Sequence, residues 1–298
     1  MPSGILLLDK PRGLTSNAAL QRVRTLFQRE KAGHVGSLDP LATGMLPICL
    51  GEATKIAADI LAGRKCYRFT VRLGTRTATA DAEGEVIETA EVPALAQEQV
   101  ARVLVGFIGR QEQVPPMYSA IKRAGRPLYA LAREGITVPR APRKIELFGL
   151  SLLALSPEAL ELEALCSPGT YIRVLAEDIA RALGTLGHIA ALRRLYVEPF
   201  EKEPMLTLDA LEHAAGSERE GALLSIDWPL AHLPAVYLPP TDAARLRHGQ
   251  SVIAKAAPAS PRVRLYEMTG RFLGIGAAES TGAVRPRRLL NLESAPRQ

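Results

Sequence analysis

Two hydrophobic periods alternate irregularly along this sequence, and the mixture constrains the fold more than any other feature. The segment CYRFTVRLG (66–74) repeats with a period of two, which places Tyr67, Phe69 and Val71 on one face of a half-buried strand. The apolar residues that follow the SPGT turn (167–170) repeat with a helical period instead. Because strands and helices are mixed without regular βαβ alternation, the sequence predicts an α+β fold.

The same two patterns predict the other elements. Ser16 is expected to cap an amphipathic helix, and Gly184 is expected to end the helix that follows residue 170. Residues 33–44 are rich in glycine and are expected to form a loop. Further strands are expected at 4–8, 145–155 and 159–166, and a further helix at 97–109.

Positive charge is concentrated in two segments. The chain has 298 residues and a net charge of +6. Residues 110–144 carry 8 basic and 2 acidic side chains together with five prolines, and residues 231–298 carry 10 basic and 4 acidic side chains. Proline-rich sequence at 229–240 marks a domain boundary, after which short apolar runs predict a small β-rich domain. The segregated charge indicates a polyanion contacted at two places, although a solvated basic surface explains charge alone equally well.

Several protein classes are excluded by what the sequence lacks. It has no basic leader before an apolar run and no stretch of 18 apolar residues, so neither a signal peptide nor a membrane span is expected. Its three cysteines are far apart, which argues against disulfides or a zinc site and favours the reducing cytoplasm. A Walker loop, HExxH and GxSxG are all missing, and GIGAAE (274–279) lacks the βαβ context of a dinucleotide site.

One loop carries residues able to do chemistry. In GHVGSLDPLATG (33–44), His34 and Asp39 lie between glycines, which allow the backbone to approach a ligand closely. Asp39 precedes Pro40, and the local sequence alone favours Asp39 as the cap of a helix over 41–49. His34 could be an ordinary surface histidine. The local sequence leaves both alternatives open.

The wider sequence resembles the TruB family, the bacterial tRNA pseudouridine synthases that modify the TΨC-loop uridine at conventional tRNA position 55. The likeness runs nearly end to end, and Val35 and Ser37 are mild departures within the loop. The matching segments are LLLDKPRGLTS (6–16), GHVGSLDPLATGMLPICLGEATK (33–55), QVPPMYSAIKRAGRPLYALAREGITVPR (113–140), CSPGTYIRVLAEDI (166–179), LRRL (192–195), HGQSV (248–252), GRFLGIG (270–276) and VRPRRLL (284–290).

The resemblance implies roles for individual residues. Asp39 matches the catalytic nucleophile, Tyr67 the tyrosine stacked on the target base, and Arg173 the arginine paired with the aspartate. Without the resemblance, Tyr67 is explained by core packing and Arg173 by an exposed helix start. The remaining matches are Tyr171 and Leu192 in the uracil pocket, His34 in the space left by the flipped base, Lys10 near the site, and Lys122, Arg123, Arg126 and Arg143 on the RNA backbone.

The resemblance also implies the architecture and the partners. Residues 1–231 correspond to a catalytic domain with a mixed, largely antiparallel sheet flanked by helices and an RNA-gripping insertion at about 110–144. Residues 232–298 correspond to a small PUA pseudobarrel. The implied substrate is tRNA, with its T-arm at the catalytic domain and its acceptor side at the C-terminal domain, bound by a monomer.

Isomerisation adds and oxidises nothing, so neither cofactor nor metal is expected. Two other functions remain open at this point. The first is RNA binding or chaperoning without catalysis, against which the intact set of Asp39, Tyr67 and Arg173 argues. The second is guide-RNA-dependent modification, against which GRPLYALAREG (125–135) argues because it resembles the stand-alone form.

Overall fold

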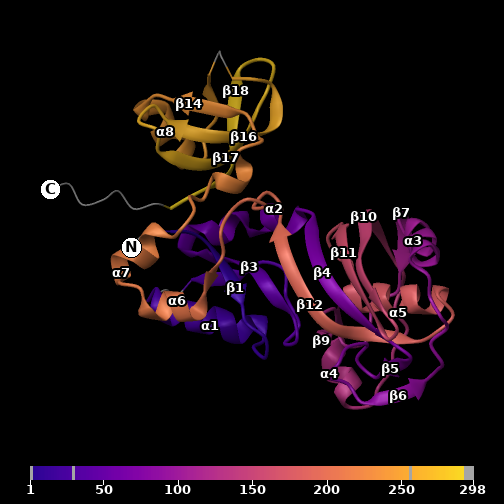
Figure 1. The fold of residues 1–298 in the computed structure, drawn as a ribbon. Coiled ribbons are helices and arrows are strands. Elements are labelled where there is room, and N and C mark those ends of the chain that lie inside the picture. The colour runs from indigo at the N-terminus through magenta and orange to yellow at the C-terminus, as the bar shows by residue number, and fades with distance from the viewer. Residues whose placement is uncertain (1–2, 29–30, 255–256, 292–298) are drawn as a thin grey trace.

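A long bent sheet forms the centre of the molecule (Figure 1). The computed structural model describes residues 3–28, 31–254 and 257–291, and within them this sheet has nine strands. The strand order is β13 (Leu206–Thr207), β1 (Gly4–Lys10), β3 (Thr43–Leu50), β12 (Gly187–Val197), β4 (Lys65–Leu73), β11 (Ala159–Cys166), β10 (Arg143–Ser156) and β7 (Gly109–Gln113), with β2 (Ala32–His34) also paired to β3. The β1–β13 and β3–β12 pairings are parallel and the others antiparallel, which confirms the predicted mixed, largely antiparallel sheet.

Helices flank this sheet. Helix α5 packs on β12 and β4, α3 packs on β10, and α1 lies against β3 and α6 (Figure 1). Their apolar faces join one core with the inward faces of the central strands. The helices before residue 235 are α1 (Ser16–Leu26), α2 (Ala57–Ala62), α3 (Gln97–Val105), α4 (Leu128–Arg133), α5 (Ile172–Ala182), α6 (Leu208–His213) and α7 (Gly216–Gly221), with short 3₁₀ turns η1 (Gly51–Ile56) and η2 (Trp228–Leu230).

Two expectations near the N-terminus were wrong in detail. The cap of α1 is Thr15, whose side chain accepts from the Ala18 N–H, whereas the Ser16 hydroxyl bonds to Leu38. Residues 43–50 form strand β3 instead of a helix, because they pair with β1 along their whole length. Asp39 therefore caps no helix, and the alternative explanation of Asp39 as a helix cap is removed.

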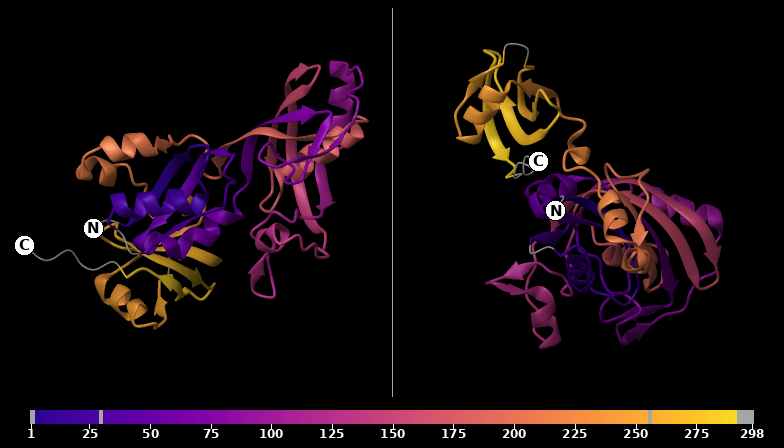
Figure 2. Two further views of the ribbon diagram at one scale, coloured as in Figure 1. Left: turned by 90° about the horizontal axis from the view of Figure 1, so that it is seen from below. Right: turned by 90° about the vertical axis from the view of Figure 1, so that its left-hand side faces the viewer.

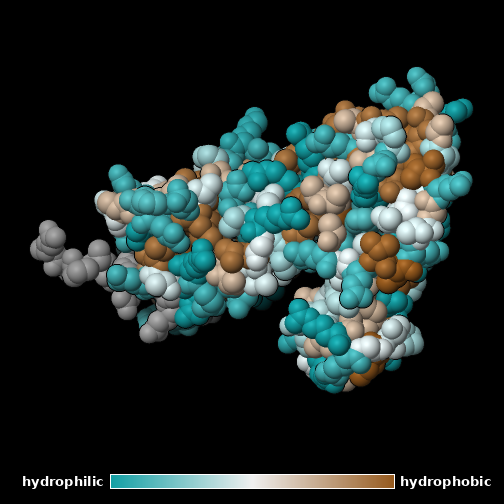
Figure 3. Space-filling view, turned by 60° about the horizontal axis from the view of Figure 1, so that its bottom comes forward, coloured by the Kyte–Doolittle hydropathy of each residue, from teal (hydrophilic) through white to brown (hydrophobic). Residues whose placement is uncertain are grey.

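The basic segment projects from the body. Between β7 and β10, residues 114–142 form a lobe with a hairpin of β8 (Lys122–Arg123) and β9 (Arg126–Pro127) followed by α4. We call residues 114–142 the basic lobe. Figure 2 shows it standing away from the sheet, and Figure 3 shows a hollow between the lobe, at lower right, and the rest of that face. A second small hairpin pairs β5 (Thr75–Thr77) with β6 (Val86–Thr89).

The C-terminal residues build a separate curled sheet, as the sequence predicted. Its strand order is β14 (Ala235–Leu238), β16 (Ser260–Glu267), β17 (Phe272–Ala278), β18 (Ala283–Leu289) and β15 (Val252–Ile253), with α8 (Pro240–Arg247) packed against it. It has its own apolar core. Tyr266, Phe272 and Ile275 belong to a second cluster that includes Ile56 and Ile60 of the main body. None of the helices in the described ranges is long and apolar enough to span a membrane.

Candidate active site

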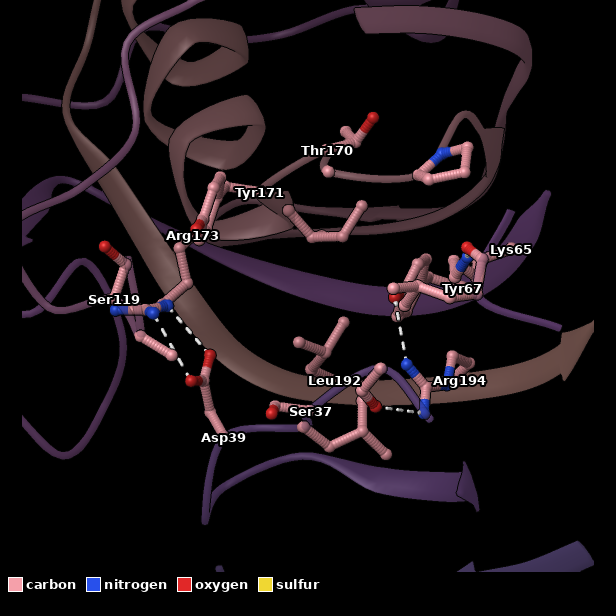
Figure 4. Close-up of a pocket in the computed structure, with 17 residues that line it drawn as sticks. Ser37, Asp39, Lys65, Tyr67, Ser119, Thr170, Tyr171, Arg173, Leu192 and Arg194 are labelled. Carbon is pink, nitrogen blue, oxygen red and sulfur yellow. Dashed lines mark hydrogen bonds and ion pairs between the residues drawn. The ribbon is translucent and has the colours of Figure 1, made fainter. Parts of the chain in front are cut away.

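A cavity of about 260 Å³ opens between the central strands and the start of α5 (Figure 4). It lies below the 300–1,000 Å³ typical of sites for drug-sized ligands, a size that suits a single nucleobase. Leaving aside the four residues expected on the RNA backbone, five of the seven residues expected from the resemblance line this cavity. The lining residues are Gly36, Ser37, Leu38, Asp39, Leu61, Lys65, Tyr67, Ser119, Ala120, Pro168, Gly169, Thr170, Tyr171, Ile172, Arg173, Leu192 and Arg194.

The loop that carries Asp39 is fixed on both sides of this residue. The Ser16 hydroxyl accepts a bond from the Leu38 N–H at 2.8 Å and donates one to the Leu38 carbonyl at 3.0 Å. The ammonium of Lys10 donates to the Pro40 carbonyl at 3.4 Å. These contacts come from β1 and α1, so the N-terminal motif positions the carboxylate although it contributes no lining residue.

Arg173 contacts both oxygens of Asp39. Its Nε lies 2.9 Å from Oδ2, and its Nη2 donates to Oδ1 at 3.3 Å (Figure 4). The same guanidinium donates to the carbonyls of Thr79 at 2.9 Å and Tyr118 at 2.7 Å, and Arg173 is buried. A planar guanidinium held at four points fixes the orientation of the carboxylate that it contacts.

A second carboxylate, which the sequence interpretation missed, lies beside this pair. Asp81 Oδ2 is 3.9 Å from Arg173 Nε, and Asp81 Oδ1 accepts bonds from the Thr79 hydroxyl and the Glu83 N–H. Burial raises the pKa of Asp39 above its ordinary value, Arg173 opposes this rise, and Asp81 adds to it. Arg173 is therefore shared between two carboxylates, of which Asp39 is the more exposed.

Tyr67 and Leu192 form the apolar part of the cavity. Tyr67 lies on β4 directly opposite Arg194 of β12, and both Tyr67 and Leu192 are 8% exposed. The Tyr67 hydroxyl accepts from Arg194 Nη1 at 3.5 Å. Burial raises the pKa of Tyr67, so its hydroxyl is protonated at neutral pH. Both residues line the cavity, so Tyr67 offers an aromatic ring and Leu192 an apolar side chain against which a planar base can pack.

Arg194 is the largest side chain that the sequence interpretation overlooked. It is 1% exposed and donates to the carbonyls of Met45 at 2.6 Å and Gly36 at 2.8 Å. Gly44 has φ +97°, and a Cβ there would lie 2.1 Å from the Arg194 carbonyl oxygen, which explains the need for glycine. In a strand, alternate side chains share a face, so LRRL places Arg194 on the same face as Leu192. This pattern could have identified Arg194 as a site residue.

Two expected residues lie outside the cavity wall. His34 is half-buried on β2, pairs with Ile48 of β3, and its Nδ1 has no partner in the described structure. Burial, and then Arg194, lower the pKa of His34, so the ring is neutral at pH 7. Lys10 is fully buried and also donates to the Pro11 and Leu14 carbonyls. Burial lowers the pKa of Lys10 to about 8 despite the nearby Asp39.

The basic residues expected to bind RNA are divided between two environments. Lys122, Arg123 and Arg143 are exposed and line one shallow cavity of about 170 Å³ beside Arg140. Arg126 instead forms an ion pair with Glu134 within the basic lobe. The described residues contain no group of three or more His, Cys, Asp and Glu side chains arranged to hold a metal ion.

Comparisons with known proteins agree with this architecture. A family model described as the N-terminal domain of TruB family pseudouridylate synthase matches residues 24–172. Models described as tRNA pseudouridylate synthase B C-terminal domain and as pseudouridine synthase II TruB, C-terminal, match residues 173–239 and 234–290. A solved structure titled as a Cbf5-Nop10-Gar1 complex is similar over 96% of this chain and 84% of its own, with a TM-score of 0.72 and 25% identity.

Curated relatives extend the match over nearly the whole chain. The tRNA pseudouridine synthase B of Chromohalobacter salexigens is 51% identical over 98% of this chain and 95% of its own length. The protein of the same name from Stutzerimonas stutzeri is 50% identical over 98% of this chain and 96% of its own. The fold and these relatives define the chain as a pseudouridine synthase, an isomerase. Within that class, the chain belongs to the TruB family of pseudouridylate synthases.

Proposed function

We propose that this protein isomerises the uridine at position 55 in the TΨC loop of tRNA to pseudouridine. Asp39 acts as the nucleophile on a flipped-out base, and the reaction uses neither a cofactor nor a guide RNA. Relatives that are about half identical over nearly their whole length bear the name tRNA pseudouridine synthase B, which supports tRNA as the substrate. The covalent role of a carboxylate is a known form of nucleophilic catalysis.

The contact of Arg173 with both oxygens of Asp39 is the observation that carries this proposal. The guanidinium opposes the rise that burial causes in the pKa of Asp39, and its two contacts fix the carboxylate at the cavity. Tyr67 and Leu192 are placed to hold the uracil ring beside it. Of Asp39 and Arg173, Asp39 has the more exposed side chain, as an attacking group requires.

A stacked base cannot enter a cavity of this size, so the target nucleotide must leave the stack before it reacts. Extrusion leaves a gap in the RNA. His34 lies on β2, at the start of the loop that carries Asp39, and its ring nitrogen Nδ1 has no partner among the described residues. We assign to His34 the filling of this gap and contact with the RNA backbone.

Two positively charged surfaces support the binding of a large RNA. Lys122, Arg123 and Arg143 would contact phosphates near the T-arm. Residues 232–298, a PUA-like RNA-binding domain, carry a net charge of +6 and would contact the acceptor side. Residues 1–231 would then be the catalytic domain, and one copy of the chain would suffice for one tRNA.

Guide-dependent modification is the second candidate, because the solved structures with this fold include one titled H/ACA RNP bound to a substrate RNA. That likeness is 22% in sequence identity and concerns the fold alone. The relatives named tRNA pseudouridine synthase B are about twice as similar. The stand-alone reaction is therefore the function that we propose.

The test is incubation of the purified protein with an unmodified tRNA transcript and no other RNA, followed by mapping of pseudouridine. One pseudouridine at position 55 is expected, and none in a matched transcript with cytidine at that position. Product formation only after addition of a guide RNA, or product at another position, would contradict the proposal. A transcript that binds without conversion would favour RNA binding or chaperoning alone.

A further inference from the structure

Two buried cations lie at the end of the cavity away from Asp39. Lys65 of β4 is 5% exposed and Arg194 of β12 is 1% exposed. Figure 4 shows both beside Tyr67, on the opposite side of the cavity from the Asp39–Arg173 pair. Neither residue is used in the reaction as described so far.

Neither cation has an acidic partner in the described parts of the chain, where no carboxylate lies in ion-pair contact with Lys65 or Arg194. A buried charge without a counter-ion costs several kcal/mol, and an apolar side chain of similar size is usually as stable or more stable. Protein stability alone therefore does not explain why two such charges line one cavity. A bound ligand that carries negative charge, or a strong hydrogen-bond acceptor, would offset the cost of burying these two charges.

Both cations retain unused donors. The Lys65 ammonium donates to the carbonyls of Leu61 and Gly63, each at 2.6 Å, and an ammonium has a third N–H. Arg194 uses its Nε and Nη2 on backbone carbonyls, while its Nη1 lies 3.5 Å from the Tyr67 hydroxyl and has a second N–H to donate. The unused donors belong to residues that line the cavity.

The geometry of uracil specifies which of its atoms would lie nearest to the unused N–H groups of Lys65 and Arg194. When C1′ of the ribose is held at Asp39, the ring atom farthest from C1′ is C4, opposite N1, and its oxygen points to the far end of the cavity. In pseudouridine the ribose is attached at C5, and the ring atom opposite C5 is C2. A carbonyl oxygen therefore faces the far end both before and after the base turns.

We propose that Lys65 and Arg194 bind this distal carbonyl oxygen and stabilise the negative charge that develops on the detached base. The proposal rests on the proposed function and adds two substrate-contacting residues to it. When Asp39 attacks C1′, the C1′–N1 bond breaks, its electron pair stays with uracil, and the charge spreads over N1, O2 and O4. When C5 of the turned base attacks C1′, the bond between C1′ and Asp39 breaks and its electron pair returns to the carboxylate. C5 then releases its proton, and N1 gains one. Fixed cations placed where charge develops stabilise such a step.

The test compares Lys65→Met with wild type on two T-arm stem-loops that carry uridine or 4-thiouridine at the target. The sulfur of 4-thiouridine accepts hydrogen bonds more weakly than oxygen and holds negative charge better. Detachment of the 4-thiouracil base therefore depends less on nearby cations. On uridine, the single-turnover rate at saturating RNA is expected to fall by about tenfold to a hundredfold. The defect is expected to be at least about threefold smaller on 4-thiouridine. Lys202→Met, at an exposed lysine, is the control and should behave as wild type.

The test does not depend on how Lys65→Met changes the melting temperature, because the ratio of the two rates in one preparation does not depend on the folded fraction. Equal defects on both substrates would overturn the proposal by showing that Lys65 acts through the structure alone. So would a rate on uridine equal to that of Lys202→Met. If wild type made no pseudouridine in the uridine stem-loop, the proposed function would fail instead.

Discussion

The cavity and the basic lobe both depend on positive charge, but they hold it in opposite ways. In and around the cavity, Arg173, Arg194 and Lys10 are at most 5% exposed, and each donates to backbone carbonyls that hold it in place. In the lobe, Lys122 and Arg123 are exposed on the two-residue strand β8, and at its base Arg143 is exposed at the start of β10. Buried cations fix the geometry of neighbouring groups, whereas exposed cations attract phosphates over distance. The first region should therefore set the rate of the bound reaction, and the second should set affinity.

Asp39→Asn should have the largest effect, because it removes the nucleophile from the region that sets the rate. The single-turnover rate should fall by at least about 10³-fold. Affinity for tRNA should change little, because Asn keeps the size of the side chain. Single-turnover pseudouridine formation and equilibrium binding measure the two effects separately. A near-normal rate in this variant would remove Asp39 from the chemistry.

Arg173→Lys sharpens the comparison, because it preserves charge and changes geometry. Lysine cannot contact both Asp39 oxygens together with the Thr79 and Tyr118 carbonyls. We expect the rate at saturating RNA to fall by about 10²-fold or more, with little change in affinity. Arg181→Lys, at an exposed arginine on the same helix, is the matched control. Wild-type turnover in Arg173→Lys would show that charge alone is sufficient there.

Replacement of Lys122, Arg123 and Arg143 together by glutamine should have the reverse effect. Loss of three phosphate contacts should weaken RNA binding by about tenfold or more and reduce the slope of log affinity against log salt by about 2. Binding titrations at several salt concentrations give both values. Arg126→Gln should change binding less, because Arg126 is already paired with Glu134. An unchanged salt slope in the triple variant would mean that the RNA does not reach this face.

The C-terminal sheet should show the smallest effect. Deletion of residues 232–298 would also expose Ile56 and Ile60, so substitution is the cleaner test. Arg285 and Arg287 are exposed, and their joint replacement by glutamine should reduce the salt slope by about 1 for full tRNA. A T-arm stem-loop should bind the variant as it binds wild type. Equal weakening for both RNAs would place these arginines near the T-arm instead of the acceptor side.

The elements that are regular along the chain were predictable from sequence. Strand β4 and helix α5 each bury one face, so their periods of 2 and 3.6 appear directly in the residues. Strand β3 was not predictable from its own residues, because TGMLPICL is apolar without a clear period. Its conformation depends on pairing with β1, about 40 residues earlier in the chain. Long-range pairing therefore overrode the local Asp-Pro signal for a helix.

The site residues likewise divide into those that could be expected from the sequence and those that could not. The positions of Asp39, Tyr67 and Arg173 on one cavity were expected from several motifs taken together. Asp81 and Lys65 were missed because nothing in their local sequence distinguishes them from surface charges; only the folded structure places them beside Arg173 and Tyr67. The cap expected at Ser16 lies one residue earlier, at Thr15, and the Ser16 hydroxyl instead bonds to Leu38, a contact 22 residues away in the chain.

The most direct test of the division between the two regions is to measure rate and affinity side by side for Asp39→Asn and for the triple variant at Lys122, Arg123 and Arg143. The RNA is one unmodified tRNA transcript, and the rate is taken at saturating enzyme. We predict a crossed result: Asp39→Asn binds like wild type and forms almost no pseudouridine, while the triple variant binds weakly and reacts at nearly the wild-type rate once bound. A triple variant that stayed slow when saturated, or an Asp39→Asn variant that reacted normally, would contradict the account.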